Sequence, residues 1–105
     1  MELVEGWTGR LTWTLTEDEV AIDGTGKTVS AVDLIGADGV PADTTGDFGW
    51  DTQASGIAYY DPDSGDLQAA KSPYRLRFQV TDGSGKVRWY PGGKPLEIVV
   101  YARGV

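Results

Sequence analysis

The sequence predicts an all-β fold, a sandwich of short antiparallel strands, and two observations lead to this expectation. Apolar and polar residues alternate in short runs along the 105 residues, as they do in strands with one buried face. The 15 Gly and 5 Pro supply turns between those runs. One domain, residues 1–105, is expected because a chain of this length holds a single core, and residues 1–8 are expected to form an N-terminal arm.

Five strands are expected in the first 60 residues. The clearest is the first, where Leu11, Trp13 and Leu15 alternate with threonines and point to one side. The third is a β-branched run, and the last two are rich in aromatic residues. A charged turn at residues 17–19 and, at residues 40–47, a loop or short edge strand interrupt the series. The expected strands cover residues 10–16, 20–22, 28–35, 48–51 and 56–60.

The second half contains the strongest local pattern, a β-hairpin. Residues 74–81 and 86–90 alternate, and Asp82-Gly83-Ser84-Gly85 between them predicts a four-residue turn. The side chains expected to face the core from this hairpin are Leu76, Phe78, Val87 and Trp89.

The remaining signals complete an immunoglobulin-like pattern. Residues 67–71 predict one helical turn, and the alternation of residues 96–100 predicts a last strand. Seven or eight short strands in about 100 residues are typical of an immunoglobulin-like sandwich. Tyr74, at the start of its strand, is expected to anchor a corner through its hydroxyl group.

The chain contains no cysteine and no histidine. Disulfides, thiol nucleophiles, catalytic triads with histidine and His-ligated metals are therefore excluded. Two carboxylates can act together in glycosidases, but ordinary turn and surface roles account for Asp38, Asp47, Asp51 and Asp82. We expect no enzyme activity and no cofactor. The N-terminal residues show neither a signal peptide nor a membrane span, so no membrane contact is expected.

The charges are divided unevenly along the chain, whose net charge is −7. Residues 1–66 hold 14 Asp and Glu against two Lys and Arg, whereas residues 67–105 hold two against seven. The overall acidity argues against nucleic acid as a partner. The side chains expected on the solvent face of the hairpin are Arg75, Arg77, Lys86 and Arg88. Two interpretations stay open: these cations pair with acidic loops of the same chain, or they contact an acidic surface of a neighbouring protein.

Two further groups of residues are candidate sites. The segment Asp61-Pro62-Asp63-Ser64-Gly65-Asp66 brings together three carboxylates, which is compatible with calcium, but it departs from the EF-hand pattern and a solvated turn is the favoured interpretation. The aromatic residues expected to be exposed, for an interface or for a sugar, are Trp7, Trp50, Tyr60 and Tyr90.

Several segments resemble small immunoglobulin-like virion domains of tailed bacteriophages, related to the N-terminal domains of upper baseplate proteins. Residues 22–29 resemble a strand-turn-strand element of that family, although Gly24 stands where a hydrophobic residue is usual. The other segments that carry the resemblance are residues 55–59, 74–82, 85–91 and 96–100.

The resemblance implies a non-catalytic virion protein of the tail, baseplate or head-tail region, made in the cytoplasm of the bacterial host. Its partners would be other virion proteins and further copies of itself, because tails are built on symmetric rings. The interface residues expected under this hypothesis are Arg75, Arg77, Lys86, Arg88, Tyr90, Trp50 and Tyr60. A carbohydrate-binding or host-adhesion module is the alternative.

Overall fold

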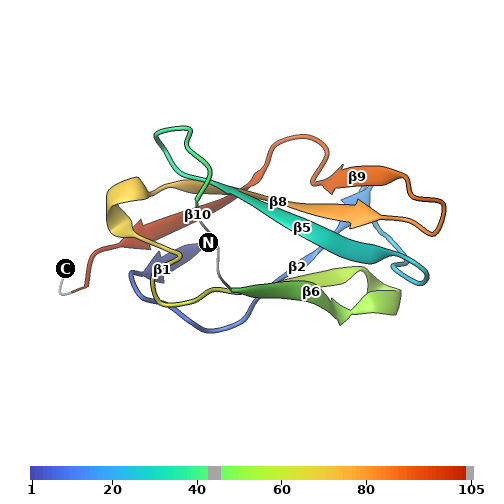
Figure 1. Cartoon of the computed structure of the whole chain (residues 1–105), viewed down its shortest axis with the longest axis horizontal. Coiled ribbons are helices and arrows are strands. Elements are labelled where there is room, and N and C mark those ends of the chain that lie inside the picture. The colour runs from blue at the N-terminus through green and yellow to red at the C-terminus, as the bar shows by residue number, and fades with distance from the viewer. Residues whose placement is uncertain (43–45, 104–105) are drawn as a thin grey trace.

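Ten strands make up about half of the computed structural model, which describes residues 1–42 and 46–103 (Figure 1). The all-β prediction is confirmed, with more strands than the seven or eight expected. The strands are β1 (Glu2–Val4), β2 (Leu11–Thr14), β3 (Thr16–Glu17), β4 (Val20–Ala21), β5 (Thr28–Ile35), β6 (Asp47–Thr52), β7 (Ile57–Asp61), β8 (Tyr74–Thr81), β9 (Val87–Tyr90) and β10 (Leu96–Tyr101). Two 3₁₀ turns, η1 (Gln53–Ser55) and η2 (Ala69–Lys71), join them, and η2 matches the expected helical turn.

The large sheet is built around β8. Strand β5 pairs with residues 75–81 of β8 on one side, while β10 and β9 share the other side, β10 along residues 74–76 and β9 along residues 78–81. Strand β1 pairs with β10 in parallel, so part of the expected N-terminal arm belongs to the sheet. The sheet is therefore mixed, where only antiparallel strands were expected.

A three-stranded sheet in the order β2-β7-β6 forms the second layer, and it lies below the large sheet in Figure 1. The single strand expected at residues 10–16 is divided in the structure. The main-chain amide of Leu15 donates to the carbonyl of Gly56, and the Leu15 carbonyl accepts from the amide of Ile22. After Leu15 the chain forms the β3–β4 hairpin, whose turn residues Asp18 and Glu19 have φ values of 50° and 67°.

The core fills the space between the two sheets. Alternate residues of β8 point into it, and Tyr74, Leu76 and Phe78 are fully buried. The ring of Trp13 from the small sheet lies 5.4 Å from that of Phe78, which joins the two layers. Each such large side chain contributes roughly 1.5–3 kcal/mol on burial. The Tyr74 hydroxyl accepts a hydrogen bond from the amide of Gln68, as expected of a corner anchor.

The register of the β8–β9 hairpin differs from the prediction by one residue. Thr81 pairs with Val87 and Phe78 with Tyr90, so Arg88 and Tyr90 lie on the core side of β9. Val87 and Trp89, predicted to be buried, are instead 50% and 40% exposed. The loop is shorter than expected because the Asp82 amide already bonds to the Lys86 carbonyl, and Gly85 takes a φ of +84°. A slip of one residue exchanges the two faces of a strand.

Gly24 is buried where the resembled family has a hydrophobic side chain. A Cβ atom on this residue would lie 2.6 Å from the Gln53 carbonyl oxygen and 2.8 Å from the ring of Trp50. The Trp50 ring therefore takes up the space that a side chain at position 24 would need. Within residues 1–42 and 46–103, no helix is long and apolar enough to cross a membrane.

Candidate functional site

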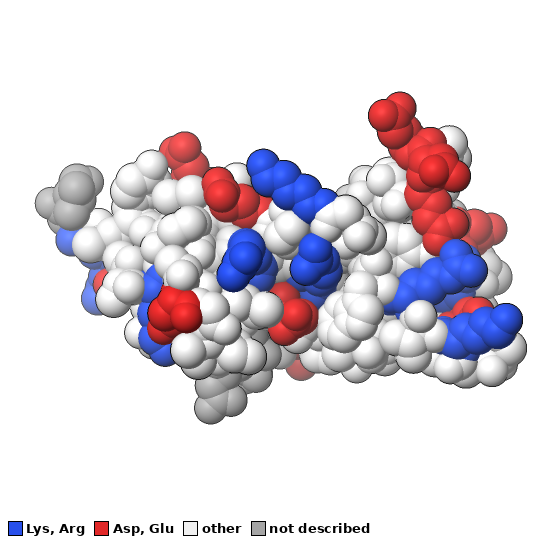
Figure 2. Space-filling view, turned by 90° about the horizontal axis from the view of Figure 1, so that it is seen from above, with Lys and Arg blue, Asp and Glu red and all other residues white. Residues whose placement is uncertain are grey.

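A groove of about 1000 Å³ lies beside β9 and is open to solvent. Residues 16–19 of the β3–β4 hairpin line one wall, and residues 88–94 of β9 and the following loop line the other. We call this hollow the β9 groove. In Figure 2, acidic side chains project at the edge of the face shown, next to basic ones.

Glu17 links the two walls of the β9 groove. Its carboxylate accepts hydrogen bonds from the Tyr90 hydroxyl at 2.5 Å and from Nη1 of Arg88 at 2.8 Å. The bond from Tyr90, followed by that from Arg88, lowers the pKa of Glu17, because both favour the ionised carboxylate. Burial, followed by the bond to Glu17, raises the pKa of Tyr90. The Arg88 and Glu17 side chains are 63% and 47% exposed, so this ion pair contributes little to stability.

The edge of β9 that faces away from β8 has no partner strand within residues 1–42 and 46–103. Hydrogen-bonded and non-hydrogen-bonded pairs alternate in an antiparallel ladder. Asp82 and Lys86 form a hydrogen-bonded pair. Two and four residues further along the ladder, the pairs Val80–Arg88 and Phe78–Tyr90 are therefore hydrogen-bonded too. The main-chain groups of Val87 and Trp89 therefore point outward, and these two residues also have exposed side chains.

Arg77 fixes the loop that closes one end of the groove. Its guanidinium group donates to the carbonyl of Pro91 at 3.2 Å and to that of Gly93 at 2.6 Å. The loop has two prolines and two glycines, and its carbonyl groups gain partners from a charged donor on β8. Arg77 was expected to form an interface, but its polar group holds this loop in the same chain.

The basic face expected on the hairpin is mixed in charge. Arg75 and Arg77 do point outward from β8, but Glu97 of β10 stands opposite Arg75 and Asp33 of β5 stands opposite Arg77. Figure 2 shows basic and acidic side chains interspersed on this face. Lys86 and Arg88 lie elsewhere, around a small cleft of about 110 Å³ that Lys27 and Asp82 also line.

The aromatic residues expected to be exposed are mostly inside the protein. Tyr60 is fully buried and Tyr90 is 4% exposed, so that prediction was wrong for both. Trp50 is partly buried, and its indole nitrogen donates to the Lys27 carbonyl at 2.9 Å. Trp7 is exposed as expected. Trp89, which the prediction placed in the core, lines the β9 groove, and a correct register would have identified it.

The three carboxylates of residues 61–66 do not converge on one point. Asp61 faces outward and binds Arg10, whereas Asp66 is buried and accepts bonds from the Tyr60 hydroxyl at 2.6 Å and from the amides of Gly46 and Asp63, both at 3.1 Å. Burial, followed by the bond to Asp66, raises the pKa of Tyr60 far above its ordinary value. Asp66 thus organises the turn through hydrogen bonds. Among the described residues, no cluster of three acidic side chains is arranged to hold a metal ion.

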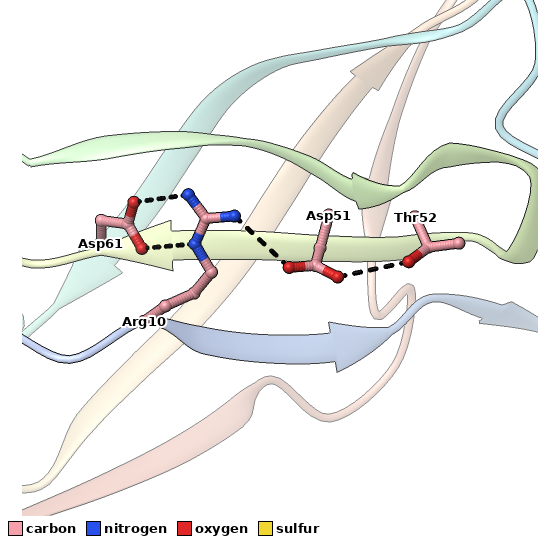
Figure 3. Close-up of polar contacts among 4 residues, drawn as sticks. All are labelled: Arg10, Asp51, Thr52 and Asp61. Carbon is pink, nitrogen blue, oxygen red and sulfur yellow. Dashed lines mark hydrogen bonds and ion pairs between the residues drawn. The ribbon is translucent and has the colours of Figure 1, made fainter.

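Arg10 joins the strands of the small sheet on their outer face (Figure 3). Its guanidinium group makes two 2.9 Å bonds to Asp61 and one of 3.4 Å to Asp51, which in turn accepts from the Thr52 hydroxyl. It also lies 3.7 Å above the ring centre of Tyr59. The bond to Asp61 raises the pKa of Arg10. Two carboxylates of the acidic half, Asp51 and Asp61, are therefore paired within the chain.

The β9 groove combines outward-facing main-chain groups, a partly exposed tryptophan and carboxylates, which together suit the binding of an extended polar molecule. Comparisons of the chain with protein-family models, with curated proteins and with solved structures found no match.

Proposed function

We propose that this chain is a non-catalytic structural module of a bacteriophage virion, with an immunoglobulin-like fold, and that it acts through protein–protein contacts at the β9 groove. The observation that carries the proposal is the unpaired edge of β9, where Val87 and Trp89 are exposed beside a groove. Exposed apolar side chains next to an open hollow are typical of interaction sites.

The order of the strands supports the immunoglobulin-like part of the proposal. The small sheet β2-β7-β6 has the order of strands B, E and D, and β10-β8-β5 has the order of G, F and C. Tyr74 stands at the start of β8, the counterpart of strand F, and its hydroxyl bonds to Gln68 upstream, as in a tyrosine corner. The β3–β4 hairpin and β9 are then additions to this framework.

The resemblance described above supports the virion part of the proposal, because its best-fitting segments form β7, β8, β9 and β10. Charge adds a second argument for contact with neighbours. Arg75 has no hydrogen bond or ion pair within residues 1–42 and 46–103, in a chain with a net charge of −7. A basic side chain of this kind can orient the acidic part of a neighbouring copy, which is compatible with a ring or another homo-oligomer.

The proposal is tested by replacing an exposed groove residue in particles purified from cells that produce them. Trp89→Glu places a charge in the proposed contact and should reduce incorporation into particles at least tenfold. Val40→Glu is the matched control, since Val40 is 54% exposed outside the groove, and should be incorporated normally. Both variants should unfold at the temperature of the parent protein. Normal incorporation of Trp89→Glu, or absence of the parent chain from the particles, would reject the proposal.

A carbohydrate-binding module is a second candidate because Trp89 is 40% exposed and lines the same groove as Asp18 and Glu19. Sugars stack on such rings and bond to carboxylates nearby. Glycan-array binding that is lost in Trp89→Ala, and kept when the partly buried Trp50 is replaced by Phe, would favour this candidate over assembly.

A further inference from the structure

We propose that the free edge of β9 binds an extended, basic segment of a partner protein as an additional strand of the large sheet. The inference rests on the proposed function and names how the contact at the β9 groove is made. Its partner is defined by chemistry, an extended peptide with Lys or Arg at alternate positions.

The main chain of β9 is arranged for strand addition. The amide and carbonyl groups of Val87 and Trp89 point away from β8, and no hydrogen bond from another described residue reaches them. An extended peptide alongside would restore the ladder on this side. Natural edge strands are commonly protected by Lys or Pro. Here Lys86 and Pro91 lie just outside β9, and the residues with outward main-chain groups carry Val and Trp.

The β9 groove provides the space for such a strand. Residues 16–19 stand across the groove from β9, and the volume of about 1000 Å³ lies between them. Glu17 keeps the two walls together beneath this space through its bonds to Arg88 and Tyr90. A strand paired with β9 in this groove would also contact the β3–β4 hairpin, because residues 16–19 line the same groove.

The charges of the opposite wall favour a basic peptide. Asp18 and Glu19 have no ion pair among the described residues, whereas the charge of Glu17 is balanced by Arg88. The remaining cation of the groove is Lys94, in the loop at one end. Two carboxylates against one cation give a negative wall, and the net charge of −7 attracts basic segments from a distance.

The binding experiment uses the peptide acetyl-Lys-Val-Lys-Val-Lys-Val-amide with the full chain labelled with ¹⁵N. Binding should slow hydrogen exchange of the Val87 and Trp89 amides at least tenfold and leave the amides of Arg88 and Tyr90, already bonded to β8, nearly unchanged. The same peptide with Glu in place of Lys should bind at least tenfold more weakly. Equal binding of the two peptides would overturn the basic partner.

Paired variants separate main-chain pairing from side-chain contact. Val87→Pro removes an outward amide without removing a bond to β8, and should weaken peptide binding about tenfold. Val87→Ala trims the side chain and should weaken it less than threefold. Equal losses would overturn strand addition. A peptide methylated on alternate main-chain nitrogens tests the same bonds on the unaltered protein. Either of the two sets of alternate nitrogens can face β9, so two peptides are made, one for each set. Unimpaired binding of both peptides would also overturn strand addition.

Further outcomes separate this inference from the proposed function. If Trp89→Glu is lost from particles but the Lys peptide does not bind, strand addition is wrong and the assembly function stands. If the Val87 and Trp89 amides become protected at high protein concentration without peptide, the strand comes from a second copy, and the basic partner is wrong.

Discussion

Two carboxylate–tyrosine pairs in this protein have similar geometry and different surroundings. Asp66 accepts a bond from the Tyr60 hydroxyl at 2.6 Å, and Glu17 accepts one from the Tyr90 hydroxyl at 2.5 Å. Asp66 is only 4% exposed and also bonds to two main-chain amides, whereas the Glu17 side chain is 47% exposed. We call these the Asp66 network and the Glu17 network.

The difference shows how the same contact can serve stability in one place and adaptability in another. In the Asp66 network, removing the carboxylate strands buried donors, each of which costs roughly 1–3 kcal/mol when unsatisfied. In the Glu17 network, the Glu17 and Arg88 side chains are 47% and 63% exposed, so water can take the place of their bond, whereas the bond from Tyr90 is part-buried. The contact between the β3–β4 hairpin and β9 is therefore weaker than the Asp66 network, which suits a wall of a binding groove.

Removing each carboxylate in turn should give the largest contrast. Asp66→Ala leaves the Tyr60 hydroxyl and the Gly46 and Asp63 amides without this acceptor, and should lower the free energy of unfolding by about 3 kcal/mol. Glu17→Ala should lower it by less, because the Glu17 and Arg88 side chains are 47% and 63% exposed and only the Tyr90 hydroxyl loses a part-buried acceptor. Denaturant unfolding followed by fluorescence measures both. Equal losses would show that the two networks do not differ as described.

Tight packing outside the groove is tested at Gly24, next to Trp50 and Gln53. Gly24→Ala should destabilise the protein by about 2 kcal/mol, because the new Cβ meets the Gln53 carbonyl and the Trp50 ring. Gly65→Ala is the control near the Asp66 network, since no atom lies within 4 Å of a Cβ there, and it should be nearly neutral. Thermal unfolding of both variants measures the loss of stability. An unchanged unfolding temperature for Gly24→Ala would contradict the close contact of this position with Gln53 and Trp50.

The smallest effect is the pH dependence of the Glu17 network. The fold lowers the pKa of Glu17 below 4.5, so its contacts contribute stability at higher pH and are lost as the pH falls through the lowered pKa. An NMR titration of the Glu17 carboxyl group should give a midpoint below 4.5. Tyr90→Phe removes the leading cause and should raise that midpoint. A midpoint at or above the ordinary value in the parent protein would contradict the network.

Local patterns in the sequence predict much of this fold. The strand at residues 28–35 appears where its β-branched run places it, and the β8–β9 hairpin and the last strand appear where alternation places them. The pairing of β1 with β10 was missed because it joins opposite ends of the chain, where no local pattern reports it. The register of β9 was missed because the same turn residues allow two loop lengths.

The candidate site was harder to predict because its contacts are distant in sequence. Tyr90 and Glu17 are 73 residues apart. Neither residue, taken alone, indicates that the two side chains will meet and form a hydrogen bond. Charge alternation predicted a basic face, but strand neighbours supplied Asp33 and Glu97 opposite the arginines. Trp89 became a groove residue through the one-residue change in register.

The division of one side of β8 between β10 and β9 has a consequence for how this protein can vary. The core strands β5, β8 and β10 remain joined to one another without β9, since β10 pairs directly with β8 along residues 74–76. The hairpin tip is thus an appendage of a complete scaffold. Related chains could carry tips of other lengths and sequences on the same scaffold, and so exchange one binding preference for another while the rest of the molecule folds as before.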